Sequence, residues 1–276
     1  MSDKLIIFDY SGTLSLEAVA FGRSDILIHH LQKSGLSALG VDNTALFWKI
    51  VNETWPEGST THAGYKKVMR QRIAELFELK AVAKRKEITR SVSKFVDAYL
   101  DYSRIDERWR SILKKLSLDE SVDVIIATDH YAEATGAIID HLATWDIRAV
   151  PVTSGNVSGC FSKEMKGQTG AGSNFFVANS ADVGVHKAHV QFWRTVKKIL
   201  QLNCRRILLV DDFGQNEQSA DAYVDAEKIN ERTRMTQKIL RDTFAADVQI
   251  IYFAAEEEQA MEMIAAAVKT IEQFLL

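Results

Sequence analysis

The chain has 276 residues, of which 46% are hydrophobic and 26% charged, a balance typical of a folded globular protein rather than a disordered or collagen-like one. The net charge of -3 gives no support to binding of nucleic acid or a membrane surface, and two cysteines are too few for a disulfide framework. No apolar run approaches the roughly 18 residues of a membrane-spanning helix or resembles a secretory signal. We therefore expect a soluble, cytoplasmic protein with no nucleic-acid or membrane partner.

The first third of the chain predicts one strand followed by helices. The apolar run at residues 5–8 is stopped by Asp9 and the Ser11-Gly12 pair, which is typical of a buried parallel strand that ends in a loop. No convincing strand follows until residue 119. Apolar residues at helical spacing instead predict four or five helices, at 18–32, 43–53, 62–79, 86–101 and 107–116. We therefore predict an all-α cap of residues 16–118, inserted after the first strand.

The rest of the chain alternates between the two kinds of element. Apolar runs predict strands at 122–127, 207–210 and 248–253, with weaker ones at 147–152 and 174–178. Helical spacing marks the segments between them, at 133–142, 187–202, 220–243 and 259–274. This alternation predicts an α/β fold, a doubly wound, Rossmann-like parallel sheet formed by residues 1–15 and 119–276.

Polar residues at the ends of the predicted strands indicate where chemistry would take place. Ligands of open α/β sheets bind beyond the carboxyl ends of the strands. Asp9 and Thr128 each follow a predicted strand, the pair Asp211-Asp212 follows another, and Lys187 begins a helix. A carboxylate can attack phosphorus, and paired acids can hold Mg²⁺ through oxygen. A hydroxyl and an ammonium can neutralise the charge of a transferring phosphoryl group.

These segments resemble the motifs of the haloacid dehalogenase superfamily of phosphatases and phosphotransferases. Residues 8–14, with the sequence FDYSGTL, resemble the first motif, and residues 125–128 resemble the second. His186-Lys187-Ala188 is similar to the third, and residues 208–212 with Asn216-Glu217 are similar to the fourth. The helical insert lies between the first and second motifs, as in members with a cap there. Residues 157–161 are similar to a hairpin of phosphoserine-phosphatase-like members.

The resemblance implies a role for each matching residue. Asp9 would be the nucleophile that forms an aspartyl-phosphate. The carboxylates of Asp9 and Asp211 and the backbone carbonyl of Ser11 would bind Mg²⁺, with Asp212 as a ligand or close beside it.

A small phosphorylated molecule is the substrate that the resemblance implies. Thr128 and Lys187 would hold its phosphate group, and the backbone amides around Ser11 and Gly12 would donate hydrogen bonds to its oxygens. No feature of the sequence indicates an oligomeric state.

One position departs from the family pattern. Most phosphatases of the family carry a second aspartate two residues after the nucleophile, as general acid and base, and here that residue is Ser11. Loss of a general acid costs about 100- to 10,000-fold in rate. Three interpretations follow: a substrate with a good leaving group, a proton supplied by the cap or by His130 or His186, or a catalytically weak protein with a binding or regulatory role.

Plainer interpretations of the same residues stay open. Thr128 and Asp211-Asp212 could be helix caps. Lys163 and Lys166 also follow the second motif, so they compete with Lys187 for the role of the phosphate-binding lysine. The basic stretch at residues 66–94 is typical of a solvated helix face. Aromatic residues at helical spacing predict a cap core, namely Trp48, Trp55, Tyr65 and Phe77. A bacterial receiver domain is disfavoured, because there the acid pair precedes the phosphorylated aspartate.

Overall fold

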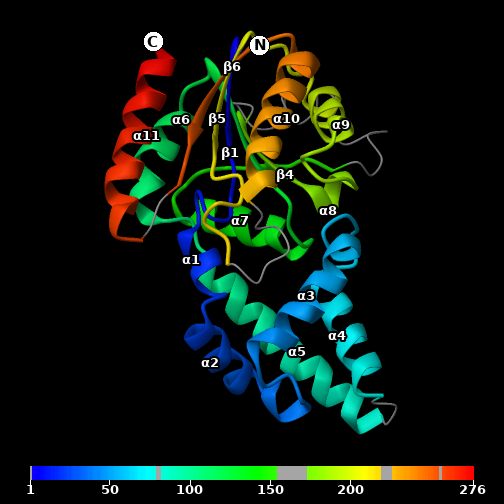
Figure 1. Cartoon of the computed structure of the whole chain (residues 1–276). Helices are drawn as coiled ribbons and strands as arrows, with labels where there is room; N and C mark the ends of the chain where they lie inside the picture. Colours follow the sequence, from blue (N-terminus) through cyan, green and yellow to red (C-terminus); the bar gives the residue numbers. More distant parts are fainter. Residues whose placement is uncertain (1, 79–81, 154–172, 219–225, 255–256) are drawn as a thin grey trace.

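The computed structural model describes residues 2–78, 82–153, 173–218, 226–254 and 257–276. Figure 1 shows two lobes: one built around a parallel sheet, and one made only of helices. Both chain termini lie at the far end of the sheet lobe, away from the helical lobe. No helix in the described residues is long and apolar enough to cross a membrane.

The sheet has six strands, all parallel, in the order β3-β4-β2-β1-β5-β6. The strands are β1 (Lys4–Phe8), β2 (Val122–Thr128), β3 (Val150–Pro151), β4 (Phe175–Asn179), β5 (Arg206–Asp211) and β6 (Asp247–Tyr252). Strand β1 is central, and Phe8 pairs in register with Ile126 of β2 and Val210 of β5. The prediction of a doubly wound α/β sheet is confirmed, and the carboxyl ends of β1, β2 and β5 meet at one edge.

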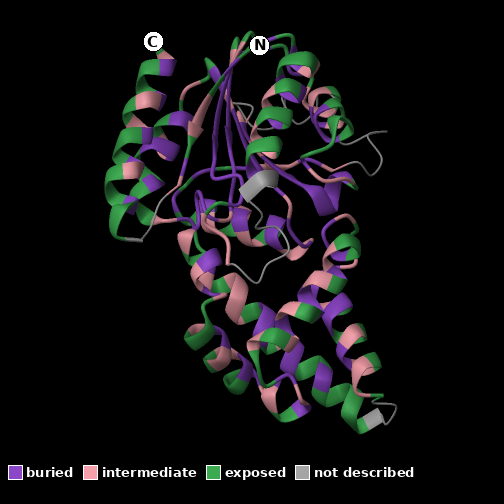
Figure 2. Ribbon diagram, viewed as in Figure 1, coloured by how far each residue is buried: buried purple, intermediate pink, exposed green. Residues whose placement is uncertain are grey.

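Both faces of the sheet are covered, because side chains alternate along each strand. Ile6 and Phe8 pack in one layer, and Leu5 and Ile7 pack in the other. The first layer contains α6 (Arg110–Ser117), α7 (Glu133–Thr144) and α11 (Ala260–Leu275), and the second contains α8 (Ser180–Val183), α9 (Val190–Leu200) and α10 (Ala226–Phe244). Figure 2 shows the strands as the most continuously buried part of the molecule. Each fully buried aliphatic or aromatic side chain contributes about 1.5–3 kcal/mol to folding.

The helical lobe has its own apolar core. Its helices are α1 (Leu16–Ala20), α2 (Ser24–Ser34), η1 (Ser37–Leu39), α3 (Thr44–Gly58), α4 (Tyr65–Leu76) and α5 (Val82–Tyr102). Leu31, Ile50, Met69 and Phe95 are fully buried among them. The aromatic residues expected in this core, Trp48, Trp55, Tyr65 and Phe77, do belong to it.

The packing divides the chain earlier than the predicted boundary at residue 118. The short helix η2 (Glu107–Trp109) and α6 belong to the layer on the sheet. The ring of Trp109 lies edge-on to Phe8, with centroids 5.8 Å apart, and its indole nitrogen donates a hydrogen bond to the carbonyl of Thr13. The sequence pattern could not show this, because an amphipathic helix has the same spacing whichever core it covers.

Several other expectations differ in detail. The helix expected at 18–32 is two helices, and the strand expected at 147–152 is only Val150–Pro151. Some expectations fall outside the described residues, namely those for Lys163, Lys166, the hairpin at 157–161 and the start of the helix at 220–243. The described part of that last segment is helical from Ala226.

Candidate active site

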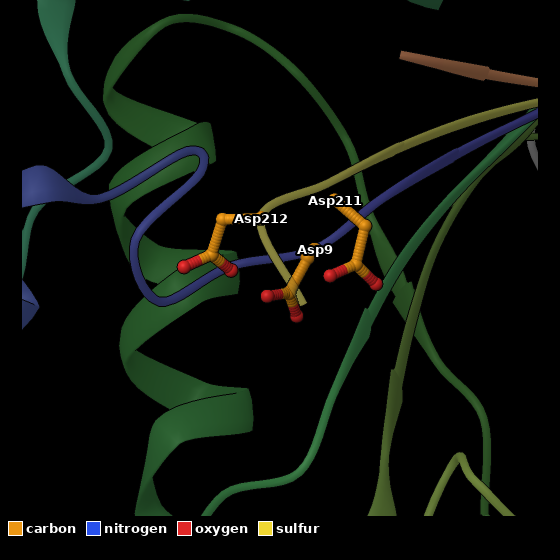
Figure 3. A group of neighbouring side chains, drawn as sticks. All are labelled: Asp9, Asp211 and Asp212. Atoms are coloured by element: carbon orange, nitrogen blue, oxygen red, sulfur yellow. The ribbon is translucent and has the colours of Figure 1, made fainter. Parts of the chain in front are cut away.

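Three carboxylates converge where the central strands end. Asp9 follows β1, Asp211 is the last residue of β5, and Asp212 comes directly after it. One oxygen from each lies within 4.8 Å of the others, and all three residues are buried. Figure 3 shows the three side chains pointing into a common space. The parallel arrangement explains this, since neighbouring strands end at the same edge.

Lys187 completes the cluster from another segment. Its ammonium Nζ donates to Asp9 Oδ1 at 2.6 Å and to Asp211 Oδ2 at 3.2 Å. Its backbone is fixed on both sides, because its amide donates to Asp129 Oδ1 at 2.8 Å and its carbonyl accepts from Trp193 Nε1 at 2.8 Å. The lysine predicted from the third motif therefore does reach the acids.

The cluster contains more acidic than basic side chains. Burial raises the pKa of Asp9 to about 7; the neighbouring Lys187 lowers it and the charge of Asp211 raises it further. Burial also raises the pKa of Asp212 well above its usual value, and repulsion from Asp9 and Asp211 adds to this. Three buried carboxylates thus face one ammonium. Oxygen donors with excess negative charge are the set that suits a hard divalent cation such as Mg²⁺.

The loop that carries Asp212 is held against the first motif. The backbone amide of Asn216 donates to Asp212 Oδ2 at 2.9 Å, and its side-chain amide donates to the carbonyl of Gly12 at 2.7 Å. Gly12 has φ +73°, and a Cβ there would lie 2.5 Å from Asp212 Oδ2. Only glycine permits both this backbone conformation and this close approach.

Two residues of the first motif make hydrogen bonds near the cluster, and the backbone carbonyl of Ser11 as a cation ligand stays a prediction. The backbone amide of Gly12 donates to the carbonyl of Ser15 at 3.0 Å and closes a turn. The Ser11 hydroxyl donates to Glu217 Oε1 at 2.8 Å. Glu217 is a site residue to which sequence reasoning gave no role, although the fourth motif contains it.

A cavity of about 110 Å³ lies beside the acid cluster. On the side of the sheet lobe it is lined by Asp9, Ser11, Thr128, Lys187 and Glu217, whereas Asp211 and Asp212 do not line it. The helical lobe supplies the opposite wall. The structure thus brings together the residues that the sequence placed at separate strand ends.

The two histidines considered as proton donors lie in different places. His130 lines the cavity, and burial lowers its pKa to about 4. Its Nδ1 accepts a hydrogen bond from the amide of Tyr131 at 2.9 Å, so its proton is on Nε2, which is 2.7 Å from the Tyr99 hydroxyl. His186 Nε2 instead pairs with the Ser59 hydroxyl at 2.7 Å. A neutral, buried imidazole is a poor proton donor.

The helical lobe is fastened to the sheet lobe beside the cavity. The Glu133 carboxylate, in the first turn of α7, accepts hydrogen bonds from the amides of Tyr65 at 2.6 Å and Lys66 at 3.1 Å, which begin α4. The rings of Tyr65 and Tyr131 stack with centroids 4.0 Å apart. The N-terminus of one lobe's helix is therefore capped by an acid of the other.

Comparison with known proteins gives structural matches without sequence matches. No family model matches the chain, and no curated protein is similar to it in sequence. Among solved structures, a 2-haloacid dehalogenase from Pseudomonas syringae pv. Tomato DC3000 has a TM-score of 0.52 and 14% identity, covering 97% of this chain and 100% of that one.

A second match, to the L-2-haloacid dehalogenase from Xanthobacter autotrophicus, has a TM-score of 0.45 and 13% identity, over 99% of this chain and 87% of that one. The match to the Pseudomonas syringae protein, together with the all-parallel sheet, shows that this chain has the α/β fold of the haloacid dehalogenases.

Proposed function

We propose that the protein is a hydrolase, a Mg²⁺-dependent phosphohydrolase or phosphotransferase that acts on a small phosphorylated molecule through an aspartyl-phosphate on Asp9. One observation carries the proposal: Asp9, which is grouped with the buried carboxylates of Asp211 and Asp212 and paired with Lys187, lines a cavity together with Lys187 and Thr128. That set combines a nucleophile, a cation site and donors for phosphate oxygens.

Asp9, Asp211 and Asp212 would hold the cation. Mg²⁺, when bound, supplies positive charge that keeps Asp9 ionised and offsets repulsion between the acids and an anionic substrate. The excess of carboxylates over ammonium groups in the cluster is what this role requires.

The protein's own groups account for the transfer. A carboxylate oxygen of Asp9 forms a bond to phosphorus while the bond from phosphorus to the leaving oxygen breaks, and that oxygen departs with the electron pair. Lys187 and the Thr128 hydroxyl donate hydrogen bonds to the phosphoryl oxygens. Water then bonds to phosphorus as the Asp9 oxygen leaves. One proton of that water stays on the phosphate, and the other ends on the leaving group.

A second reaction of a carboxylate nucleophile is hydrolysis of a carbon–halogen bond, the chemistry named for the Pseudomonas syringae protein. The charge of the cluster argues against it here. A 2-haloacid is itself a carboxylate, and Lys187, the cation nearest to Asp9, is already paired with two acids. Repulsion by the remaining acids would oppose binding unless a metal ion were present.

The experiment measures phosphate release from acetyl phosphate and from a panel of phosphate monoesters with Mg²⁺, and halide release from 2-chloropropionate in parallel. We expect phosphate release that disappears in Asp9→Asn and persists in Asp140→Asn, a matched change at an exposed position of α7. Activity unchanged in Asp9→Asn would remove the nucleophile, and halide release alone would replace phosphoryl chemistry. Folded, Mg²⁺-binding protein without any turnover would favour a binding or regulatory role.

A further inference from the structure

The cavity wall opposite the acids is aromatic. Three side chains of this wall come from α3 and α4, namely Trp48, Trp55 and Tyr65, and Phe95 and Tyr99 come from α5. Trp55 lies edge-on to Tyr131, with centroids 5.3 Å apart, so the rings form a connected surface. The group that leaves with the ester oxygen would lie against this wall, because Asp9 and Lys187 line the part of the cavity that belongs to the sheet lobe.

The charges around the cavity restrict what that group can be. Among the described residues that line it, Lys187 is the only lysine or arginine, and it is engaged by Asp9 and Asp211. The acids Asp129 and Glu217 also line it. A leaving group with a second phosphate or a carboxylate would meet negative charge there and no cation. An uncharged leaving group fits this part of the cavity.

The chemistry beside Asp9 restricts the leaving oxygen as well. Ser11 lines the cavity two residues after Asp9, and its hydroxyl, which donates to Glu217, is a poor proton donor. Water has a pKa of about 15.7, and an aliphatic alcohol is about as weak an acid. Its alkoxide therefore departs slowly unless an acid protonates it. A phenol has a pKa of about 10, so a phenolate can depart without one.

We propose that the substrate is a phosphate monoester of a phenol, with one phosphoryl group on an uncharged aromatic ring that lies against the Trp48 and Trp55 wall. This inference rests on the proposed function and specifies its substrate class. The phenolate leaves with the electron pair of the broken phosphorus–oxygen bond. It takes up one proton of the water that later hydrolyses the aspartyl-phosphate.

The first test separates ring recognition from leaving-group acidity. We would compare kcat/KM for phenyl phosphate, 4-carboxyphenyl phosphate, trifluoroethyl phosphate and acetyl phosphate with Mg²⁺. The carboxylated ester keeps the ring but adds a charge, whereas trifluoroethyl and acetyl phosphates have activated leaving groups without a ring. We expect phenyl phosphate to exceed the carboxylated and trifluoroethyl esters by about tenfold or more, which corresponds to about 1.4 kcal/mol.

The second test changes the wall. Trp48 is half-buried at the edge of the cap core and lines the cavity, so Trp48→Ala removes an aromatic surface of the wall. We expect the ratio of kcat/KM for phenyl phosphate to that for acetyl phosphate to fall about tenfold in Trp48→Ala and less in Trp48→Phe. Phe77→Ala is the matched control, because Phe77 is a half-buried ring of the same lobe that does not line the cavity.

The outcomes distinguish the two proposals. If acetyl phosphate is hydrolysed but phenyl phosphate is not preferred over the carboxylated and trifluoroethyl esters, the substrate class is overturned and the phosphohydrolase stands. The same holds if the ratio of kcat/KM for phenyl phosphate to that for acetyl phosphate is equal in Trp48→Ala and wild type. Absence of turnover with every phosphate overturns the proposed function and the substrate class together. Preference for the carboxylated ester would overturn the charge argument.

Discussion

Replacement of Lys187 by Met would test whether charge holds the acid cluster together. Lys187 Nζ lies 2.6 Å from one carboxylate and 3.2 Å from the other. At an effective dielectric constant of about 20, these distances give about 6 and about 5 kcal/mol of attraction. Desolvation of the ammonium offsets much of this, and removal of one partner of a buried ion pair usually costs about 3–5 kcal/mol. We expect Lys187→Met to lower the free energy of unfolding by about 3 kcal/mol in metal-free buffer at alkaline pH.

The loss should depend on pH with a defined sign. The folded-state pKa of Asp9, about 7, lies above its usual value of 3.8. The native state therefore binds more protons than the unfolded state between these values, and this carboxyl group makes stability fall as pH rises through that window. Loss of Lys187 raises the pKa of Asp9 further and extends the window upward. The difference between variant and wild type should thus be smaller near neutral pH, where only the pairing with Asp9 is weakened, and grow above it.

The assay is urea unfolding followed by tryptophan fluorescence, with EDTA and with Mg²⁺. A ligand at 100 times its Kd stabilises by about 2.7 kcal/mol, and the variant should gain at least as much as wild type, since Mg²⁺ supplies the missing positive charge. Lys198→Met, at an exposed position of α9, should change stability by no more than about 0.5 kcal/mol. Equal stability of Lys187→Met and wild type in EDTA at alkaline pH would refute the reasoning, as would no effect of Mg²⁺ on either protein.

Three further predictions use the same unfolding measurement. Gly12→Ala places a methyl group against the Asp212 carboxylate at φ +73°, so it should lower the free energy of unfolding by about 3 kcal/mol and weaken stabilisation by Mg²⁺. Gly184→Ala, at φ +89° with open space around it, should lower it by only about 1 kcal/mol. Equal losses in the two variants would show that the contact with Asp212 is unimportant. Because burial lowers the pKa of His130 to about 4, the unfolded state takes up its proton first, so this group alone adds about 3 kcal/mol of stability between about pH 4 and pH 6.5, opposite in sign to the contribution of Asp9. The stability of wild type minus that of His130→Phe should therefore rise by about 3 kcal/mol over this range, and parallel curves would count against the assignment. Glu133→Ala removes the acceptor of two backbone amides at the start of α4 and should lower the free energy of unfolding by about 2 kcal/mol. Glu53→Ala breaks an exposed ion pair and should lower it by less than about 1 kcal/mol. A smaller loss for Glu133→Ala than for Glu53→Ala would show that the cap is unimportant.

The fold was predictable because a parallel sheet has a strong local signature. Runs such as 5–8 and 207–210 are apolar throughout, since both faces of the sheet are covered, and each is ended by an acid. The carboxyl ends of parallel strands share one edge of the sheet, so the sequence alone predicts that Asp9 and Asp211 lie together. Lys187 follows no strand, and its place depended on the resemblance to a family motif.

The cavity was not predictable from the same patterns. Helical spacing shows that Trp48 and Trp55 lie on an apolar face, but it cannot show whether that face meets another helix or an open space. They do both, since they pack on the cap core and line the cavity. Glu217 was overlooked for a different reason: an acid in a loop carries no periodic signal, and only the contact with Ser11 places it in the site.

The position of β1 has a consequence for synthesis on the ribosome. It emerges before the other described strands of its sheet, yet its two partners begin at residues 122 and 206. At about 5–20 residues per second, the four apolar residues Leu5–Phe8 wait roughly 10–40 s for their second neighbour. The middle of the sheet is completed late, after the helices of residues 16–102 have had time to form by themselves. A nascent chain arrested before residue 206 should therefore leave the apolar segment Leu5–Phe8 exposed, and chaperones should bind it.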